Sequence, residues 1–156
     1  MNQSTSNQGA VELRRGDRVP RLRLPAVGGG ERSVRGRGPR ILLVVHPGCA
    51  RCAEYARSVG EAAGALPDWD ADIMVASPAA EGFEGLDGVT VVRDPDRALG
   101  EGLTVLVLDR WGEVYHAGHH GGDHDAASPE ELLEWVRFVA IQCPECEGPE
   151  GPWASL

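Results

Sequence analysis

The sequence predicts an α/β domain in which helices flank a mixed sheet with parallel strands and a C-terminal antiparallel hairpin. Three observations support this class. The apolar run Ile41 to Val45 leads directly into a Cys-x-x-Cys pair, Cys49 and Cys52, that opens a helical pattern; the stretch VLVLDRWGEVYHAG has the pattern of a hairpin; and a capped helix follows it. Strands that alternate with helices along the chain are typical of α/β folds.

The first part of the chain predicts short extended segments after a polar leader. Residues 1 to 12 are polar, and we expect them to be disordered. Prolines and glycines interrupt residues 16 to 40, and GGGERSVRG indicates a turn with one short strand. Ile41 to Val45 is a continuous run of Ile, Leu and Val, which predicts a strand buried on both faces of the sheet.

A helix is predicted next, from about Ala50 to Leu66, where Pro67 ends it. The elements expected after it are strands at Ala71 to Ala76 and Val89 to Val92, a short helical turn at Asp96 to Gly100, and hairpin strands at Thr104 to Asp109 and Glu113 to Ala117. The final helix has Ser128 at its N-cap, Pro129 at its first position and Glu131 completing a capping box. The domain is then expected to span residues 13 to 146, with a Pro/Gly-rich tail at 147 to 156.

Length and charge narrow the classes of partner. A chain of 156 residues is long enough for one domain and too short for two ordinary ones. Its formal net charge is −9, and residues 41 to 156 carry 6 Arg against 21 acidic residues. A body with that charge repels nucleic acid and anionic membranes, so neither is expected as a partner. The chain contains no Lys, which excludes Schiff-base chemistry.

The sequence also predicts the cellular compartment in which the protein is found. The longest uninterrupted apolar run, Ile41 to Val45, has five residues, far fewer than the roughly 20 that a membrane-spanning helix needs. The polar start of the chain lacks the apolar region of a secretory signal, so we expect a cytoplasmic protein. Thiols stay reduced there, and the 4 Cys residues are therefore expected to be catalytic, sensing or metal-binding.

Several motifs occur together: the entry GDRVPRLRLPAVGGGERSV, the buried strand that leads into Cys-x-x-Cys at a helix N-terminus, and the D-R-x-G hairpin before a closing helix. This combination resembles the redoxin branch of the thioredoxin superfamily, which includes peroxiredoxin-like proteins and thiol-disulfide oxidoreductases, over about residues 16 to 142. The resemblance implies a thioredoxin-like fold, with Cys49 as the exposed nucleophile and Cys52 as the buried resolving thiol. It also implies protein or small-molecule disulfides as substrates, and no required cofactor.

Physical chemistry supports the same roles independently. A cysteine at a helix N-terminus meets unpaired N–H groups and the positive end of the helix dipole, which can lower the thiol pKa to about 7 or below. Arg51 and His46 would add positive charge beside the thiolate of Cys49. Cys52, one turn further into the helix, lies on the apolar face and would attack the mixed disulfide.

Two features depart from the pattern of that family. Its members usually place a cis-proline at the start of the strand that faces the Cys pair, whereas the corresponding stretch GEGLTVLVLD contains no proline, and Thr104 stands near that place. Such a proline docks substrate and keeps metal off the thiols, so its absence favours metal binding. The peroxiredoxin pattern P-x-x-x-T/S-x-x-C is not met, because Arg51 and Glu54 follow Pro47 where Thr or Ser and Cys are required.

A histidine-rich segment, HAGHHGGDHD at residues 116 to 125, precedes the final helix. The resemblance to a thioredoxin-like sheet implies that the last strand runs antiparallel to the strand before the Cys pair, and that this loop returns to the edge of the sheet where Cys49 lies. Thiolate and imidazole ligands suit Zn or Cu, and the candidate metal ligands are Cys49, Cys52, His119, His120 and His124. A histidine that relays protons for Cys49 is the second reading, and a solvated Gly-rich loop is the third.

A second Cys-x-x-Cys pair, Cys143 and Cys146, lies near the C-terminus. It has three readings: a second redox pair, a metal knuckle completed between the two subunits of a homodimer, or a structural cap on the final helix. One Zn site shared by all four cysteines is disfavoured, because a final helix of about 14 residues would carry the second pair about 20 Å away.

The function predicted from the sequence is a thiol-disulfide oxidoreductase that works through a mixed disulfide, with Cys49, Cys52, Arg51 and His46 at its site. The alternative is a non-catalytic thioredoxin-fold module that binds metal or senses redox state through the Cys pair and the histidine-rich loop. A partner-binding domain with vestigial thiols is the third hypothesis.

Overall fold

The computed structural model describes residues 12–64, 72–79, 82–83, 85–86, 88–100, 102–120 and 124–141. The predictions made for residues 1 to 11 of the leader, for the Pro/Gly-rich tail and for the pair Cys143 and Cys146 lie outside these residues.

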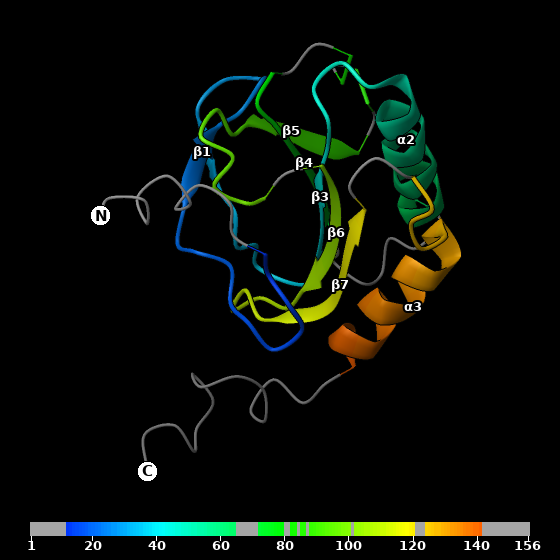
Figure 1. Ribbon diagram of the computed structural model, residues 1–156. Helices are drawn as coiled ribbons and strands as arrows, with labels where there is room; N and C mark the ends of the chain where they lie inside the picture. The colour runs from blue at the N-terminus through cyan, green and yellow to red at the C-terminus, as the bar shows by residue number, and fades with distance from the viewer. Residues whose placement is uncertain are drawn as a thin grey trace, which may run out of the picture.

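The described strands form two sheets (Figure 1). A small antiparallel sheet pairs β1 (Arg23–Pro25) with β2 (Glu31–Ser33). The main sheet has the order β5-β4-β3-β6-β7, in which β3, β4 and β5 are parallel and β6 and β7 are joined as an antiparallel hairpin. The bounds of its strands are β3 (Arg40–Val44), β4 (Asp72–Ser77), β5 (Val89–Arg93), β6 (Leu103–Leu108) and β7 (Val114–His120). The predicted α/β class, with a mixed sheet and a C-terminal hairpin, is confirmed.

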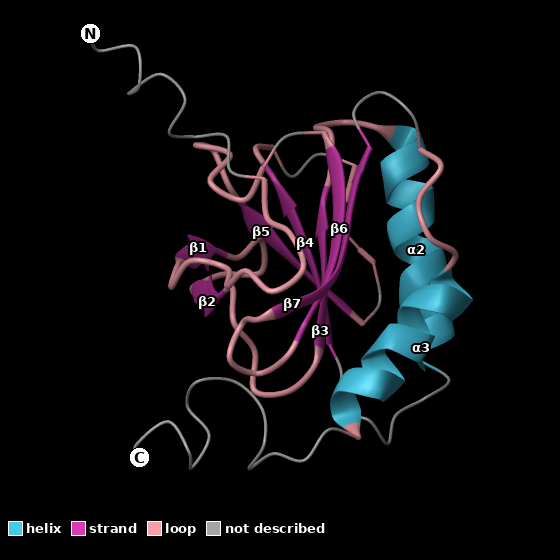
Figure 2. Cartoon of the chain, turned by 60° about the horizontal axis from the view of Figure 1, so that its bottom comes forward, coloured by secondary structure: helices cyan, strands magenta, loops and turns pink. Residues whose placement is uncertain are grey.

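Two helices, α2 (Ala50–Gly64) and α3 (Pro129–Ala140), cover one face of the main sheet, and β1 and β2 lie on the other side (Figure 2). The start of α3 is the predicted one: Pro129 is the first helical residue, and the Ser128 hydroxyl accepts a hydrogen bond of 3.2 Å from the N–H of Glu131. None of the helices in the described residues combines the length and apolar character needed to cross a membrane.

The central strand β3 belongs to both hydrophobic layers. Ile41 and Leu43 pack in the cluster under the two helices, whereas Leu42 and Val44 pack in the cluster under β1 and β2. All four side chains are at most 3% exposed. Since successive side chains of a strand point to opposite faces, the continuous apolar run forms a strand buried on both sides, as predicted.

Strand β7 differs from the prediction in length and direction. It extends to His120, three residues past the predicted end, because its backbone continues to pair with β6, from Val105 opposite Gly118 to Leu103 opposite His120. The expectation that β7 runs antiparallel to β3 is wrong: both strands are antiparallel to β6, so they run in the same direction. This shared direction brings the end of β7 to the edge where β3 ends.

A second difference lies after β5. Residues 96 to 100 form turns instead of the predicted helical turn. The buried carboxylate of Asp94 accepts hydrogen bonds from the N–H groups of Ala98 and Leu99 at 3.0 and 3.1 Å. In a helix, backbone carbonyl groups would accept these N–H groups. Here the side chain of Asp94 accepts them, which favours a turn over a helix.

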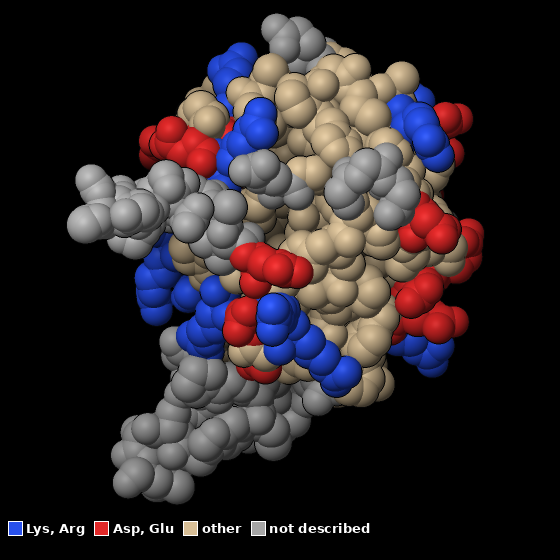
Figure 3. Space-filling view, viewed as in Figure 1, with Lys and Arg blue, Asp and Glu red and all other residues tan. Residues whose placement is uncertain are grey.

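On the face shown in Figure 3, both acidic and basic side chains lie around the rim, and several acidic groups lie close together along the right edge.

Candidate active site

Cys49 occupies the N-cap of α2. The chain leaves β3 through Val45, His46 and a turn at Pro47-Gly48, in which Gly48 has a φ of +67° that favours glycine. The carbonyl of Cys49 accepts the N–H of Ala53 at 3.0 Å, and its sulfur accepts the N–H of Cys52 at 3.4 Å. The thiol of Cys49 therefore stands where a capping side chain normally stands, facing the unpaired N–H groups of the first turn.

This position makes the two thiols chemically different. Burial by itself raises the pKa of Cys49, but hydrogen bonds from Cys52 and from the N–H of Arg51, together with the charge of Arg51, lower the pKa below its ordinary value. Burial raises the pKa of the Cys52 thiol to about 11, and the neighbouring Cys49 adds to this effect. Cys52 is fully buried and Cys49 is partly exposed, so Cys49 is the more accessible and the more acidic thiol.

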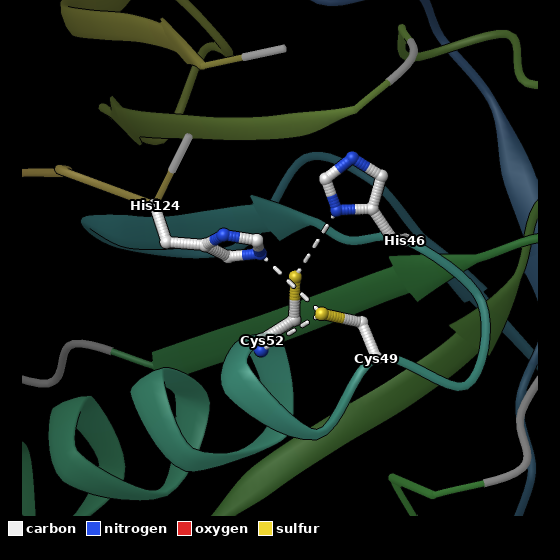
Figure 4. A group of neighbouring side chains, drawn as sticks. All are labelled: His46, Cys49, Cys52 and His124. Carbon is white, nitrogen blue, oxygen red and sulfur yellow. Dashed lines mark hydrogen bonds between the residues drawn. The ribbon is translucent and has the colours of Figure 1, made fainter. Parts of the chain in front are cut away.

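Two imidazoles complete the group (Figure 4). The Nε2 atom of His124 lies 3.3 Å from the sulfur of Cys49, and the Nδ1 atom of His46 lies 3.5 Å from the sulfur of Cys52. The two rings are tilted, with their centroids 5.5 Å apart. Each thiol thus has its own imidazole neighbour, and the four donor atoms all lie within 4.8 Å of one another.

Tyr55 anchors the segment that carries His124. Its hydroxyl donates a hydrogen bond of 2.5 Å to the carbonyl of Ala127, three residues after His124. Burial, with the nearby charge of Glu131, raises the pKa of Tyr55 to about 12, so the hydroxyl stays a donor at neutral pH. The sequence analysis did not predict this contact; the missed signal is that the hydroxyl of a tyrosine packed on the inner side of a helix requires a partner.

His119 lies on the opposite face of the sheet from the thiols. Its Nε2 atom is 2.6 Å from the carbonyl oxygen of Leu13, and its Nδ1 atom is 3.3 Å from the hydroxyl of Thr104. The neighbours of Thr104 in β6, Leu103 and Val105, face the helices, so Thr104 and the paired His119 face away from them. His119 is therefore turned away from the Cys pair by the alternation of the strand.

The remaining histidines of the segment also lie outside the group of four donors. His120 is the last residue of β7 and is not among the four, and His116 packs its ring 5.7 Å from that of Trp135 on α3. Burial lowers the pKa of His116. Of the predicted metal ligands, the structure brings together Cys49, Cys52 and His124, and it adds His46.

Thr104 occupies the start of β6, opposite Val44 at the end of β3. The residue is 1% exposed, and the described residues contain no cis peptide bond. The hydroxyl of Thr104 lies 3.3 Å from Nδ1 of His119.

Comparison with solved structures finds several proteins of the same fold. The chain is similar to the thioredoxin domain of a thiol-disulfide oxidoreductase from Bacteroides vulgatus, with 16% identity over 82% of this chain and 99% of that one and a TM-score of 0.60. It is similar to a peroxiredoxin-like protein from Aquifex aeolicus, with 17% identity over 83% and 90% and a TM-score of 0.62. A thiol peroxidase from Chromobacterium violaceum has 12% identity over 83% and 89% and a TM-score of 0.63.

These likenesses establish a thioredoxin-like fold, which confirms the fold implied by the sequence resemblance. A scan against protein-family models and a sequence search against curated proteins each found no match.

Proposed function

We propose that this chain is a thiol-disulfide oxidoreductase in which Cys49 is the nucleophile and Cys52 the resolving thiol. The observation that carries the proposal is the asymmetry of the pair: the sulfur of Cys49 caps α2 and accepts an N–H, whereas Cys52 is buried and has a pKa of about 11. Thiolate character and accessibility together select the attacking sulfur. A solved structure of similar fold that is named as the thioredoxin domain of a thiol-disulfide oxidoreductase supports the same reaction class.

In the first step, the thiolate of Cys49 attacks one sulfur of a substrate disulfide. The substrate S–S bond breaks, the other substrate sulfur leaves as a thiolate and takes up a proton, and Cys49 is joined to the substrate in a mixed disulfide. The imidazole of His124, 3.3 Å from the attacking sulfur, is placed to donate a hydrogen bond to the thiolate before it attacks.

In the second step, Cys52 loses its proton and attacks the sulfur of Cys49. His46, with Nδ1 3.5 Å from the sulfur of Cys52, is the base within reach of that proton. The mixed disulfide breaks, the second substrate thiol leaves, and a Cys49–Cys52 disulfide forms. Two electrons and two protons have then passed from the Cys pair to the substrate, and the reverse sequence oxidises a dithiol.

The substrates that fit this reaction are protein or small-molecule disulfides. The test is the reduction of insulin by dithiothreitol in the presence of a chelator, with the variant Cys143→Ser/Cys146→Ser as background so that only Cys49 and Cys52 can react. We expect Cys49→Ser to abolish the accelerated reduction. Reduced Cys52→Ser protein, mixed with insulin after dithiothreitol has been removed, is expected to accumulate a mixed disulfide that mass spectrometry detects on Cys49. The rate of hydrogen peroxide reduction, measured with the same protein, serves for comparison with the rate of disulfide reduction.

Two outcomes would overturn the proposal. The first is a background protein that accelerates the reduction of neither insulin nor small disulfides. The second is a Cys49→Ser variant that keeps the activity of the background protein.

A further inference from the structure

We propose that His46, Cys49, Cys52 and His124 form a tetrahedral zinc site. The inference goes beyond thiol-disulfide exchange, because it requires neither a substrate disulfide nor turnover. The four ligand atoms are two sulfurs and two imidazole nitrogens, and all lie within 4.8 Å of one another. A tetrahedral set of two sulfur and two nitrogen donors is typical of zinc in proteins.

The distances between donors already approach those of such a site. Zn–S bonds of about 2.3 Å and Zn–N bonds of about 2.0 Å, at tetrahedral angles, place neighbouring sulfur and nitrogen donors about 3.5 Å apart. The observed separations are 3.3 Å between Cys49 Sγ and His124 Nε2, and 3.5 Å between Cys52 Sγ and His46 Nδ1. The other pairs lie within 4.8 Å, and side-chain rotation around an ion needs to close them by at most about 1 to 1.5 Å.

The charges of the ligands also match the ion. Two thiolates carry a charge of about −2, which neutralises Zn²⁺, and the imidazoles bind as neutral rings. Cys52 is buried and the other three ligands are partly buried, so a site without net charge avoids the cost of burying an unpaired ion.

Three separate parts of the chain supply the four ligands. His46 follows the end of β3, the two cysteines stand in the first turn of α2, and His124 begins the segment that leads into α3 (Figure 4). The hydrogen bond from Tyr55 to Ala127 ties that segment to α2, and Ser128 caps α3 directly after it. Ligands from three separate parts of the chain come together only in the folded protein, so bound zinc stabilises the fold.

Metal binding and disulfide formation exclude each other at this site. Zinc binding by the reduced pair displaces two thiol protons and leaves both sulfurs as ligands. When a substrate disulfide oxidises the pair, two electrons leave the sulfurs, an S–S bond forms, and Zn²⁺ is released. Bound zinc therefore protects Cys49 from oxidation and alkylation until the metal is removed.

The test uses the full chain with Cys143→Ser/Cys146→Ser, reduced and stripped of metal. Titration with Co²⁺, which reports tetrahedral thiolate coordination through its visible and sulfur-to-metal absorption bands, is followed by displacement with Zn²⁺. We expect one equivalent to bind, with release of protons. His46→Ala and His124→Ala each remove one ligand, and we expect each to weaken binding by more than about 100-fold, beyond the range known for changes around the ligands.

Matched controls are His116→Ala and His119→Ala, which remove histidines of the same segment that lie outside the four donors. They are expected to bind Co²⁺ and Zn²⁺ as the background protein does. His124→Gln serves as a second variant, and circular dichroism confirms that every variant is folded.

The proposal is overturned if the reduced background protein gives no tetrahedral cobalt spectrum, or if the two controls lose as much affinity as His46→Ala and His124→Ala. The insulin assay runs in chelator, so a failure of zinc binding leaves the oxidoreductase result intact. In the same way, an inactive protein that binds cobalt through these four residues supports the metal site alone.

Discussion

Cys49 and Cys52 are three residues apart, yet their surroundings give them opposite acid–base behaviour. Cys49 receives N–H groups at the start of α2, which lowers its pKa, and Cys52 enters the apolar core, where burial raises its pKa to about 11. The sequence predicts this asymmetry because a helix start and an apolar stripe are both local features. The imidazole partners of the two thiols, His124 and His46, could be identified only from the folded structure.

We therefore expect Cys49 and Cys52 to become reactive over different pH ranges. Only the thiolate reacts with iodoacetamide, so the alkylation rate of each cysteine rises as pH increases through its pKa. In metal-free Cys143→Ser/Cys146→Ser protein, we expect the rate at Cys49 to rise at a lower pH than that of an ordinary cysteine, and Cys52, whose pKa is about 11, to react little at neutral pH. Mass spectrometry of the two cysteines at a series of pH values measures both.

An inflection for Cys49 at or above the ordinary thiol pKa would contradict the capping role of its sulfur. Equal alkylation of Cys49 and Cys52 at neutral pH would contradict the difference in burial. The Cys49→Ser variant is the control, since any remaining label then reports Cys52 alone.

At the scale of elements, the start of α2 and the start of α3 determine the site together. Helix α2 presents the Cys pair, and the segment before α3 presents His124. Tyr55 joins the two through its hydrogen bond to Ala127. The position of His124 therefore depends on the hydrogen bond between Tyr55 and Ala127, which are 72 positions apart in the sequence.

We expect Tyr55→Phe to loosen this connection without changing the apolar packing of the ring. Loss of a hydrogen bond that leaves a carbonyl unsatisfied costs about 1 to 3 kcal/mol, and exposure of the carbonyl to water brings the loss toward the lower value. The free energy of unfolding in urea should fall by about 1 kcal/mol, and Co²⁺ affinity should fall while the ligands remain present. Ser128→Ala is the comparison: it removes the cap of α3, with a similar loss of stability of about 1 kcal/mol.

Cobalt affinity in Tyr55→Phe that equals that of the background protein would contradict the positioning role of Tyr55. Full rescue of the unfolding free energy is not expected from added zinc, because the metal does not replace the hydrogen bond to Ala127.

At the scale of the whole molecule, Arg40 connects the small sheet to the main one. It is 8% exposed, and its guanidinium donates to both carboxylate oxygens of Asp72 at 2.6 and 2.9 Å. The same group donates to the carbonyls of Ser33 and Val34 at 2.7 and 2.8 Å. One buried side chain thus satisfies acceptors on β2, on the segment after it and on β4.

Arg40→Ala is expected to lower the free energy of unfolding by about 3 kcal/mol, because it leaves the buried carbonyl of Val34 and the partly buried carbonyl of Ser33 without their donor. The matched control is Arg23→Ala. Arg23 pairs with Glu31 at 3.5 Å, and both side chains are about 60% exposed, so its loss should change stability by less than about 1 kcal/mol. Urea denaturation measures both variants, and equal effects would contradict the role of burial.

The parts of the fold that the sequence predicted well are those set by local patterns. The run Ile41 to Val45 and the Ser128–Pro129 cap each contain their own physical signal, in apolar burial and in helix capping. Strand β7 was predicted too short, because HAGHHG lacks an apolar pattern and its last residues are strand only through pairing with β6. This pairing depends on β6, so it cannot be predicted from the residues of β7 alone.

By itself, the sequence determined that Cys49 stands at a helix start after a buried strand, and hence that it is an activated thiol. Only the tertiary structure decided which histidines are near it. His119 and His124 are both polar residues of one segment, but the alternation of β7 turns His119 to the far face, whereas Nε2 of His124 lies 3.3 Å from the sulfur of Cys49. His46, next to the Cys pair in sequence, approaches Cys52 because the turn at Gly48 folds the chain back onto α2. Side-chain direction depends on strand pairing and turn geometry, which no single residue type reveals.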